Sequence, residues 1–295
     1  MVRSRLITSL ILITLVCSAA FAANENTGTK QFAFVKLQKS VRAAGMAGTY
    51  VAIADDASAT LLNPAGLVLL QSNAIQLTYN NWLAGTSYSN LIYANYLGRS
   101  GVVSGSITYL GFGDIAETTR ALPGGTGSNF SSSGMEYSVS YGRLLSPTLS
   151  IGVTLKNVQQ SIGSTGTSSL AGNLGVLWDS PWNVKLGGVL KDVGGSLPSE
   201  TCLGVSSRFL DNKLIVGGEL ALPADNASTI HLGVEYNFSP LLTLRSGYNT
   251  RSEEKAGGKW SLGLGLNWRT FHVDYAYVPY EELGTTHRLG LKFDI

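Results

Sequence analysis

The sequence predicts an all-β protein, a transmembrane antiparallel β-barrel of about 14 strands with a small N-terminal hatch inside the barrel. Three observations predict this class. A secretory leader opens the chain, segments with period-two alternation follow over most of the remaining length, and aromatic side chains gather near the ends of these segments. No later stretch offers about 20 uncharged apolar residues, so helical membrane spans are excluded.

The N-terminus has the features of a secretory signal peptide. Arg3 and Arg5 precede an apolar run that is too short to span a bilayer, and Ala20-Phe-Ala22 forms a small-x-small site. We expect residues 1–23 to be removed by cleavage near residue 22 or 23. Cleavage would leave Cys202 as the one cysteine of the mature chain, which excludes an internal disulfide.

The composition bounds the domain organisation and the partners. The 295 residues include 35 glycines and 13 tyrosines, and only 14% are charged, which is typical of closely packed strands with little surface charge. A net charge of +2 predicts neither nucleic acid nor an acidic partner. We expect an N-terminal hatch or plug over residues 24–72 and one large β-barrel domain over residues 73–295.

The clearest strand patterns lie in the last third of the chain. From Lys259 to Trp268 the even positions are Trp, Leu, Leu, Leu and Trp, and the odd positions are Lys, Ser, Gly, Gly and Asn. One face of this strand is therefore apolar and the other is polar or empty. We expect strands near residues 74–80, 88–97, 102–111, 135–145, 149–160, 170–178, 183–193, 202–209, 214–222, 229–238, 241–249, 259–268, 271–280 and 286–295.

The connections between these strands predict the topology. Six of them are short, at residues 98–101, 146–148, 179–182, 210–213, 239–240 and 269–270. Those between them are mostly longer, and the longest is expected over residues 111–134. Short turns face the periplasm in bacterial barrels of this kind, so we expect both ends of the barrel domain, and the start of the plug, on the periplasmic side.

Aromatic residues form two groups at the predicted strand ends. One group contains Trp178, Trp182, Phe209, Phe238, Trp268 and Phe271, and the other contains Tyr79, Trp82, Tyr248, Trp260 and Tyr280. Two such groups, with almost no charge on the apolar faces between them, indicate the interfacial girdles of a membrane barrel rather than a soluble sandwich.

The stretch from Arg42 to Leu67 is rich in small residues and in residues that favour turns, which predicts a compact segment seated inside the barrel. Its candidate residues are Gly45, Gly48, Asp55, Asp56, Ser58, Asn63, Pro64 and Gly66. The first two glycines allow close backbone approach. The aspartates and the serine can cap a short helical turn that follows them. The proline pushes the preceding asparagine out of the helical region, and the last glycine can then take a positive φ.

The same stretch carries a family resemblance. "GMAGTYVAIADDASATLLNPAGL" resembles the N-terminal hatch signature of FadL-like outer-membrane barrels, and most of all their PorV/PorQ branch. "LGGVLKDVGGSLPSETCLGVSSRF", "LTLRSGYNT" and "FHVDYAYVPYEELGTTHRLGLKF" resemble later blocks of that family, so the resemblance covers most of the mature chain. It implies an integral barrel of the bacterial outer membrane.

The resemblance implies two alternative functions. FadL-like proteins pass hydrophobic small molecules, with the hatch moving to open a route. PorV-like proteins belong to type IX protein secretion and bind the C-terminal signal domain of exported proteins, although this chain is short for that role. The expected partners are outer-membrane lipid, the barrel-assembly machinery, and either a hydrophobic small molecule or such a C-terminal domain. A purely structural barrel is a third option.

Charged side chains are expected on the inward faces of the strands. They are Glu136, Lys156, Lys185, Arg208, Glu219, Glu235, Arg245, Lys259, Asp274, Arg288 and Lys292. Mixed signs on neighbouring strands indicate ion pairs that hold a narrow lumen and bind the plug. A charged permeation path is the alternative. Fourteen strands around a plug leave little water-filled section, which disfavours a wide diffusion pore.

Catalytic and metal chemistry find little support. The chain has three histidines. His272 and Asp274 share a strand face, as paired acid and base groups would, but nothing points to a nucleophile. One mature cysteine and scattered histidines give no metal-ligand spacing, and the glycine pairs in strands lack the context of a phosphate-binding loop. We expect no enzyme activity, no metal and no cofactor.

Overall fold

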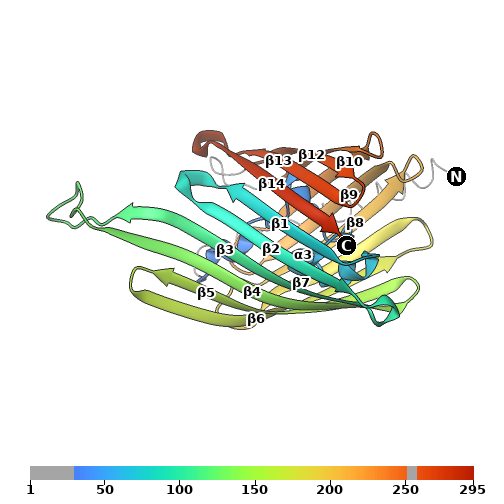
Figure 1. Ribbon diagram of the computed structural model, residues 1–295, viewed down its shortest axis with the longest axis horizontal. Coiled ribbons are helices and arrows are strands. Elements are labelled where there is room, and N and C mark those ends of the chain that lie inside the picture. Colours follow the sequence, from blue (N-terminus) through green and yellow to red (C-terminus); the bar gives the residue numbers. More distant parts are fainter. Residues whose placement is uncertain (1–29, 251–257) are drawn as a thin grey trace.

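The computed structural model describes residues 30–250 and 258–295, and the predicted signal peptide lies outside these ranges. Fourteen antiparallel strands form a closed barrel in which each strand pairs with its neighbours in sequence and β1 pairs with β14 (Figure 1). The strands are β1 (Ala74–Asn81), β2 (Ser87–Tyr96), β3 (Val102–Ala116), β4 (Asn129–Ser146), β5 (Leu149–Ile162), β6 (Thr165–Asp179), β7 (Val184–Val193), β8 (Glu200–Phe209), β9 (Leu214–Pro223), β10 (Thr229–Asn237), β11 (Leu242–Asn249), β12 (Trp260–Trp268), β13 (Phe271–Pro279) and β14 (Thr285–Asp294). This confirms the predicted 14-stranded barrel.

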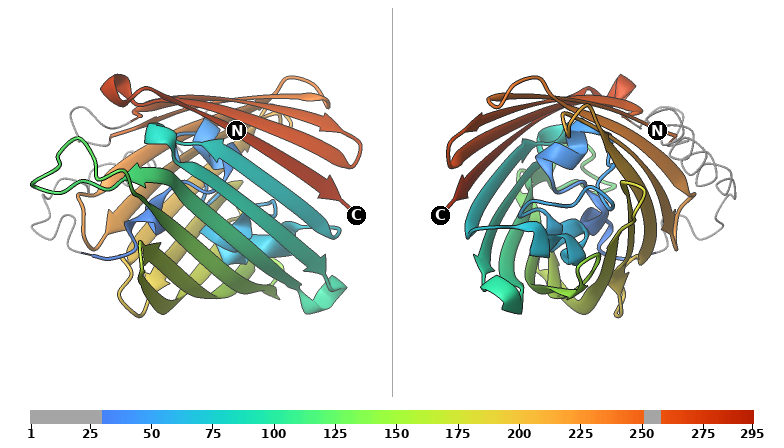
Figure 2. Two further views of the ribbon diagram at one scale, coloured as in Figure 1. Left: turned by 60° about the vertical axis from the view of Figure 1, so that its left-hand side comes forward. Right: turned by 90° about the vertical axis from the view of Figure 1, so that its right-hand side faces the viewer.

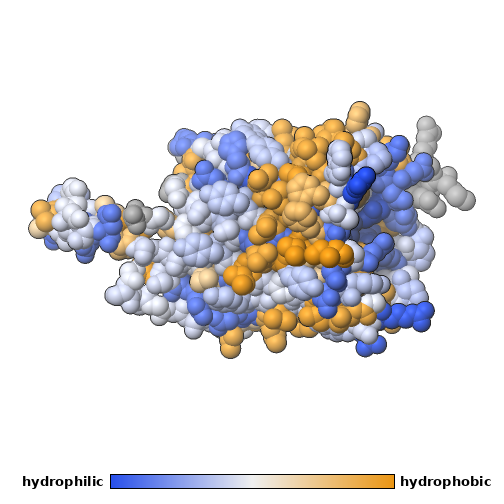
Figure 3. Space-filling view, viewed as in Figure 1, coloured by the Kyte–Doolittle hydropathy of each residue, from blue (hydrophilic) through white to orange (hydrophobic). Residues whose placement is uncertain are grey.

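The alternation in sequence becomes an alternation of burial. In β12, Leu262 is 49% exposed and Leu266 is 42% exposed, while Ser261, directly before Leu262, is fully buried. Successive side chains of a strand point to opposite faces, so the leucines cover the outside and the serine points into the barrel. Figure 3 shows such apolar side chains gathered across the wall between more polar ends.

The short connections share one end of the barrel, as expected. This short-turn end also holds the start of β1, whose Ala74 pairs with Asp294 of β14. The opposite, long-connection end holds most of the longer loops, but residues 163–164, which join β5 and β6, are as short as any turn.

The predicted loop over residues 111–134 is wrong in its extent. β3 and β4 continue to Ala116 and from Asn129, so the connection is limited to residues 117–128. Ile115 still pairs with Phe130 beyond a register shift. Both faces of this hairpin lie beyond the rest of the wall (Figure 1), where water can contact both sides. The register shift interrupts the alternation between faces, which is why these Gly- and Ser-rich strand ends read as a loop.

The chain before β1 fills the barrel, and we call residues 32–70 the inner segment. It contains η1 (Ala33–Lys36), α2 (Val41–Gly45), α3 (Ala59–Leu62) and η2 (Pro64–Leu69). The right-hand view of Figure 2 shows it within the ring of strands. α2 packs against β11 to β14, and η2 packs against β3 to β6 on the other side.

The inner segment runs opposite to expectation. Its start was predicted on the periplasmic side, but Phe34 contacts Gly134 near the long-connection end. The segment must end where β1 begins, at the short-turn end. Because it traverses the lumen before that point, it has to start at the other end.

Among the described residues, no helix is both long and apolar enough to cross a membrane.

Two of the predicted girdle residues lie inside the barrel instead. Tyr280 is only 6% exposed. Its ring meets that of Trp82 edge-on at 5.2 Å, and the Arg288 guanidinium stacks 4.9 Å from the centre of the Trp82 ring. Trp82 precedes η3 (Leu83–Gly85) and Tyr280 precedes η5 (Glu281–Leu283), so both sit in connections that turn back over the lumen. Their expected girdle neighbours Tyr79, Tyr248 and Trp260 are exposed.

Candidate functional site

The candidate site is the contact between the inner segment and the wall, with Arg42 at its centre. Arg42 lies in α2 and binds Glu235 of β10 through two hydrogen bonds, Nε to Oε2 at 2.7 Å and Nη2 to Oε1 at 2.8 Å. Its Nη1 also donates to Asp55 and, at 2.9 Å, to Asp56. Such a two-pronged bond fixes the orientation of both groups. One guanidinium therefore joins two parts of the inner segment to the wall.

The network continues along the wall. Arg245 of β11 donates to Glu235 at 2.7 Å and to Asp274 of β13 at 2.5 Å. Arg208 of β8 donates to Asp55 at 2.7 Å. Since the strands that supply these groups lie on one side of the barrel, the network anchors the inner segment to β8, β10, β11 and β13.

The charges around Asp55 set its titration. Burial alone would raise the pKa of this carboxyl group, but the neighbouring guanidiniums of Arg42 and Arg208 outweigh burial and hold that pKa at about 2. Asp55 therefore stays ionised, and its attraction to the two arginines persists, down to strongly acidic pH.

The predicted capping role is confirmed for Asp56 and wrong for Asp55 and Ser58. Ser58 is the N-cap residue of α3, yet its side chain makes no capping hydrogen bond. Asp55 is bound by the two arginines. Asp56 accepts hydrogen bonds from the Ser58 backbone N–H and the Tyr50 hydroxyl, each at 2.8 Å. Asp55 is drawn away because the guanidinium groups of Arg42 and Arg208 outcompete the N–H groups of a one-turn helix for its carboxylate.

Asn63 and Pro64 adopt the predicted turn. Asn63 is extended, with φ −148° and ψ 96°, and its side chain accepts from the Ala65 backbone N–H at 3.2 Å. Its amide donates to the Val51 carbonyl at 2.8 Å, which ties two stretches of the inner segment together. Gly66 does not take a positive φ. It is required for space instead, since an added Cβ would lie 2.5 Å from the Ala54 carbonyl oxygen.

Gly45 and Gly48 make the close approaches that their sequence suggests. A Cβ on Gly45 would lie 2.9 Å from the Cα of Gly263 in β12. Gly48 has φ +99°, and a Cβ there would lie 2.8 Å from Nδ1 of His231. The same histidine nitrogen lies 2.6 Å from the Ala47 carbonyl oxygen. A side chain at either glycine would push α2 and the turn after it away from the wall.

The wall also contributes glycines to this contact, and sequence reasoning missed them. Each of the nine strands from β4 to β12 places a glycine where a Cβ would come within 3.0 Å of the inner segment. They are Gly142, Gly152, Gly175, Gly187, Gly204, Gly217, Gly233, Gly247 and Gly263. The inward positions that looked empty are filled by backbone and side-chain atoms of the inner segment. Glycine on the inward parity of nine consecutive strands was the signal that could have revealed this.

Five of the predicted inward charges contact the inner segment. Glu136 pairs with Lys39, Arg208 with Asp55, and Glu235 with Arg42. Glu219 accepts from the backbone N–H groups of Tyr50 and Val51 at 2.8 and 2.9 Å. Arg288 donates to the Gln38 carbonyl at 3.1 Å.

The other predicted charges lie on the wall away from the inner segment or bind wall residues. Lys156 pairs with Asp192, Lys185 with Asp179 at 3.3 Å, Arg245 with Glu235 and Asp274, and Lys292 with Asp294 at 3.2 Å. Lys259 is half-buried beside the start of β12. The structure thus brings together inward charges of opposite sign across neighbouring strands.

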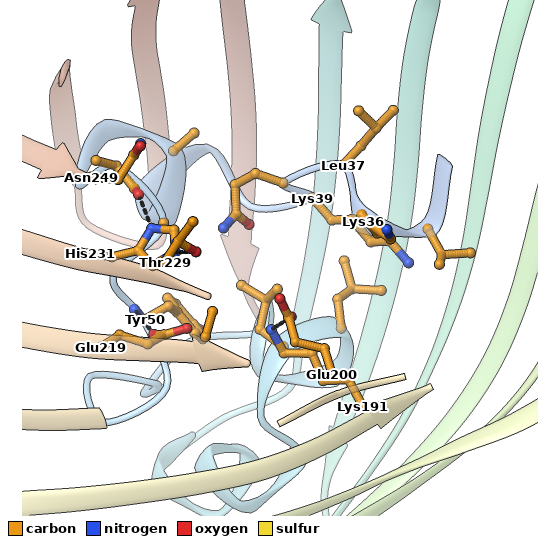
Figure 4. A pocket seen from close by; sticks show the side chains of 18 of the residues that line it. Lys36, Leu37, Lys39, Tyr50, Lys191, Glu200, Glu219, Thr229, His231 and Asn249 are labelled. Carbon is orange, nitrogen blue, oxygen red and sulfur yellow. Dashed lines mark hydrogen bonds and ion pairs between the residues drawn. The ribbon is translucent and has the colours of Figure 1, made fainter. Parts of the chain in front are cut away.

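A cavity of about 160 Å³ lies inside the long-connection end (Figure 4). Lys191 and Glu200, which face each other at 3.0 Å across β7 and β8, form part of its wall. Glu219 and His231 line it from β9 and β10, and Lys39 lines it from the inner segment. Sequence reasoning missed Lys191 and Glu200, although they share the strand faces of Lys185 and Arg208, which it placed inward.

A second cavity of about 200 Å³ lies at the short-turn end. Arg42, Asp55 and Asp56 line it from the inner segment, and Glu235 and Lys292 line it from the wall. Ala44 and Ala47 border the first cavity while Val41 and Arg42 border the second. α2 and the turn after it therefore stand between the two cavities.

The histidines do not form an acid and base pair with Asp274. His272 lies 2.9 Å from the Asn267 amide oxygen and 2.8 Å from Asp294, while Asp274 binds Arg245. Across the described residues, no group of three or more His, Cys, Asp and Glu side chains is placed to hold a metal ion.

Comparison of the structure with solved structures gives many matches. It is similar to the toluene transporter TbuX of Ralstonia pickettii, with a TM-score of 0.66 and 13% identity over 87% of this chain and 98% of that chain. It is similar to the toluene transporter TodX of Pseudomonas putida, with a TM-score of 0.63 and 13% identity over 86% and 96% of the two chains. The chain has the FadL-like barrel fold.

A FadL homologue of Pseudomonas aeruginosa matches equally well, with a TM-score of 0.63 and 13% identity over 87% of this chain and 98% of that chain. No family model matches the sequence, and no curated protein matches it. The FadL-like part of the sequence resemblance is therefore supported by the fold, while its PorV/PorQ part stays a prediction.

Proposed function

We propose that this chain is an integral β-barrel of the bacterial outer membrane that lets small molecules pass, with the inner segment acting as its hatch. The exposed leucines and aromatic residues of the wall support a lipid-facing surface. The observation that carries the proposal is the position of α2 between two cavities that lie toward opposite ends of the barrel. Moving α2 would join them.

Hydrophobic small molecules are the substrate class that we propose. The support is the likeness in fold to two toluene transporters and to a monoaromatic hydrocarbon channel. These names describe transport and not catalysis, in keeping with the expectation that the chain is no enzyme. The apolar outer face of β14, on which Leu289 and Phe293 are exposed, supports recognition by the barrel-assembly machinery.

The experiment is uptake into proteoliposomes that contain the full mature chain. Toluene should enter faster than into protein-free liposomes, and Arg42→Met, which loosens α2, should change that rate. Equal uptake with and without protein would refute transport of hydrophobic molecules.

A role in type IX secretion is the second candidate. The sequence blocks of the PorV/PorQ branch favour it, and the β3–β4 hairpin offers a projecting surface at the long-connection end (Figure 1). Co-purification of the C-terminal domain of an exported protein with the wild-type barrel, and its loss when residues 117–128 are replaced by a short turn, would support this role over transport.

A further inference from the structure

The cavity at the long-connection end is lined by charge pairs, which is an unexpected surface for a hydrophobic solute. Lys191 pairs with Glu200 at 3.0 Å, and Lys156 pairs with Asp192. The side chains of the second pair are 3% and 8% exposed. Glu219, 4% exposed, adds a carboxylate beside them. Both signs of charge are therefore present around one small volume.

We infer that, with α2 in its observed closed position, this cavity binds a small zwitterionic solute, one that carries an ammonium and a carboxylate group a few bonds apart, in preference to hydrophobic solutes. This goes beyond the proposed function, which concerns the path that opens when α2 moves, whereas the inference concerns the closed cavity.

The size of the cavity sets the size of the solute. Its volume of about 160 Å³ is close to that of a cavity in another protein, about 150 Å³, that accepts benzene. A small amino acid fits within such a volume, while a peptide or a sugar chain does not.

The charges set the chemistry of the solute. A lysine ammonium group has three donors and a carboxylate has several acceptor positions, so the bond between Lys191 and Glu200 leaves each able to bind another group. An apolar solute would remove water from these groups and give no hydrogen bond in return, which is costly. An ion of one sign would be attracted by one member of each pair and repelled by the other. A zwitterion complements both.

The cavity also offers a place for the apolar part of such a solute. Leu37 of the inner segment and Trp82 after β1 line it together with the charge pairs. Figure 4 shows Leu37 on the same side as Lys39, with Lys191 and Glu200 on another. A short aliphatic side chain of the solute can contact Leu37, while the carboxylate and ammonium groups of the solute meet Lys191 and Glu200.

Calorimetric titration of the detergent-solubilised full mature chain tests the inference. The probes are L-alanine, propionate, ethylammonium and toluene. We expect saturable binding of L-alanine, and binding of propionate and ethylammonium at least about tenfold weaker, because each lacks one charge-assisted contact. Toluene should not compete. Binding of toluene in place of L-alanine, or binding of none of the four, would overturn the inference.

Variants of one strand locate the site. Lys191→Gln should weaken L-alanine binding by about tenfold or more, since it removes the ammonium that meets the carboxylate of the solute. The matched control is Lys185→Gln on the same strand β7, whose lysine also forms a cross-strand pair, with Asp179 at 3.3 Å, but at the short-turn end. Equal loss in both variants would mean that binding is not at this cavity.

Glu200→Gln gives a second, independent test of which charged group of the solute each side chain binds. It should weaken ethylammonium binding and leave propionate binding at or above its wild-type strength, the opposite of Lys191→Gln. The outcome is separable from the transport assay. A barrel that carries toluene but does not bind L-alanine refutes only this inference, and one that binds L-alanine but carries no toluene refutes only the proposed substrate class.

Discussion

The wall and the inner segment of this barrel are stabilised by different contacts. Each strand of the wall pairs with two neighbours over seven or more residues, and the ladder closes on itself. The inner segment has helices of four to six residues, which are too short to be stable alone. Its conformation depends on the charges and glycines that the wall presents to it. The wall should therefore survive changes that release the inner segment.

Loss of Arg42 should have the largest effect, and it should destabilise the inner segment while the wall stays folded. Arg42→Met leaves Glu235, Asp55 and Asp56 without their shared cation inside the barrel, and breaking such a network typically costs about 3–5 kcal/mol. The inner segment should become sensitive to protease while the folded barrel still migrates faster than the boiled protein on a gel. Lys185→Met, at a partly exposed pair, is the control and should cost about 1 kcal/mol or less. Simultaneous loss of the fast-migrating form would show that the wall needs the inner segment.

A charge on the lipid face should act on the wall instead. Leu264→Arg, in the middle of β12, should destabilise the inserted barrel by about 2–4 kcal/mol, measured by urea unfolding in lipid vesicles. Trp268→Arg, on the same face at the strand end, should cost about 1 kcal/mol or less because the interface tolerates charge. If the two costs were equal, the apolar face of β12 would not lie against lipid.

A larger side chain between the wall and the inner segment should destabilise the protein less than the two changes above. A Cβ on Gly175 of β6 would lie 2.2 Å from the Asn63 amide oxygen, whereas Gly166 of the same strand has no atom within 4 Å. Gly175→Val should cost about 1–3 kcal/mol and raise protease sensitivity of the inner segment. Gly166→Val should leave that sensitivity unchanged. The close packing of the inner segment would be contradicted by identical behaviour of the two variants.

Acid should loosen the inner segment at a low pH. The pKa of Asp55 is about 2 against an ordinary value of 3.8, so its ionised form stabilises the folded state above pH 3.8. The lowered pKa contributes about 2 kcal/mol, which is lost as the pH falls through 3.8 to about 2. Protease sensitivity of the inner segment, assayed with pepsin, should rise over this window. Asp55→Asn should already be sensitive at pH 5 and should show no further rise attributable to this residue.

The wall was predictable from sequence to a much greater extent than the inner segment. Alternation such as that around Leu262 and Leu264 reports which face each strand buries, and it predicted most strands to within two residues. It failed in the β3–β4 hairpin, where a register shift interrupts the alternation, and at the start of β6, which begins at Thr165. Trp82 and Tyr280 were misplaced because a loop residue has no strand parity to show whether it points inward.

The contacts of the inner segment depend on residues far apart in sequence. Arg42 and Glu235 are 193 positions apart, so no local pattern links them. Local reasoning gave Asp55 a nearby helix to cap, and its partners Arg42 and Arg208 override that role. A buried arginine in a small-residue segment does require carboxylate partners, and that requirement was the available signal.

The central claim is that the inner segment closes the lumen between the two cavities. The most direct test is the ion conductance of the wild-type barrel in a planar lipid bilayer, recorded beside Arg42→Met. We predict no steady open-pore conductance for the wild type, because α2 and the glycine contacts of the wall leave no continuous channel, and brief openings for the variant. A steady conductance of the wild type, unchanged in Arg42→Met, would contradict the claim.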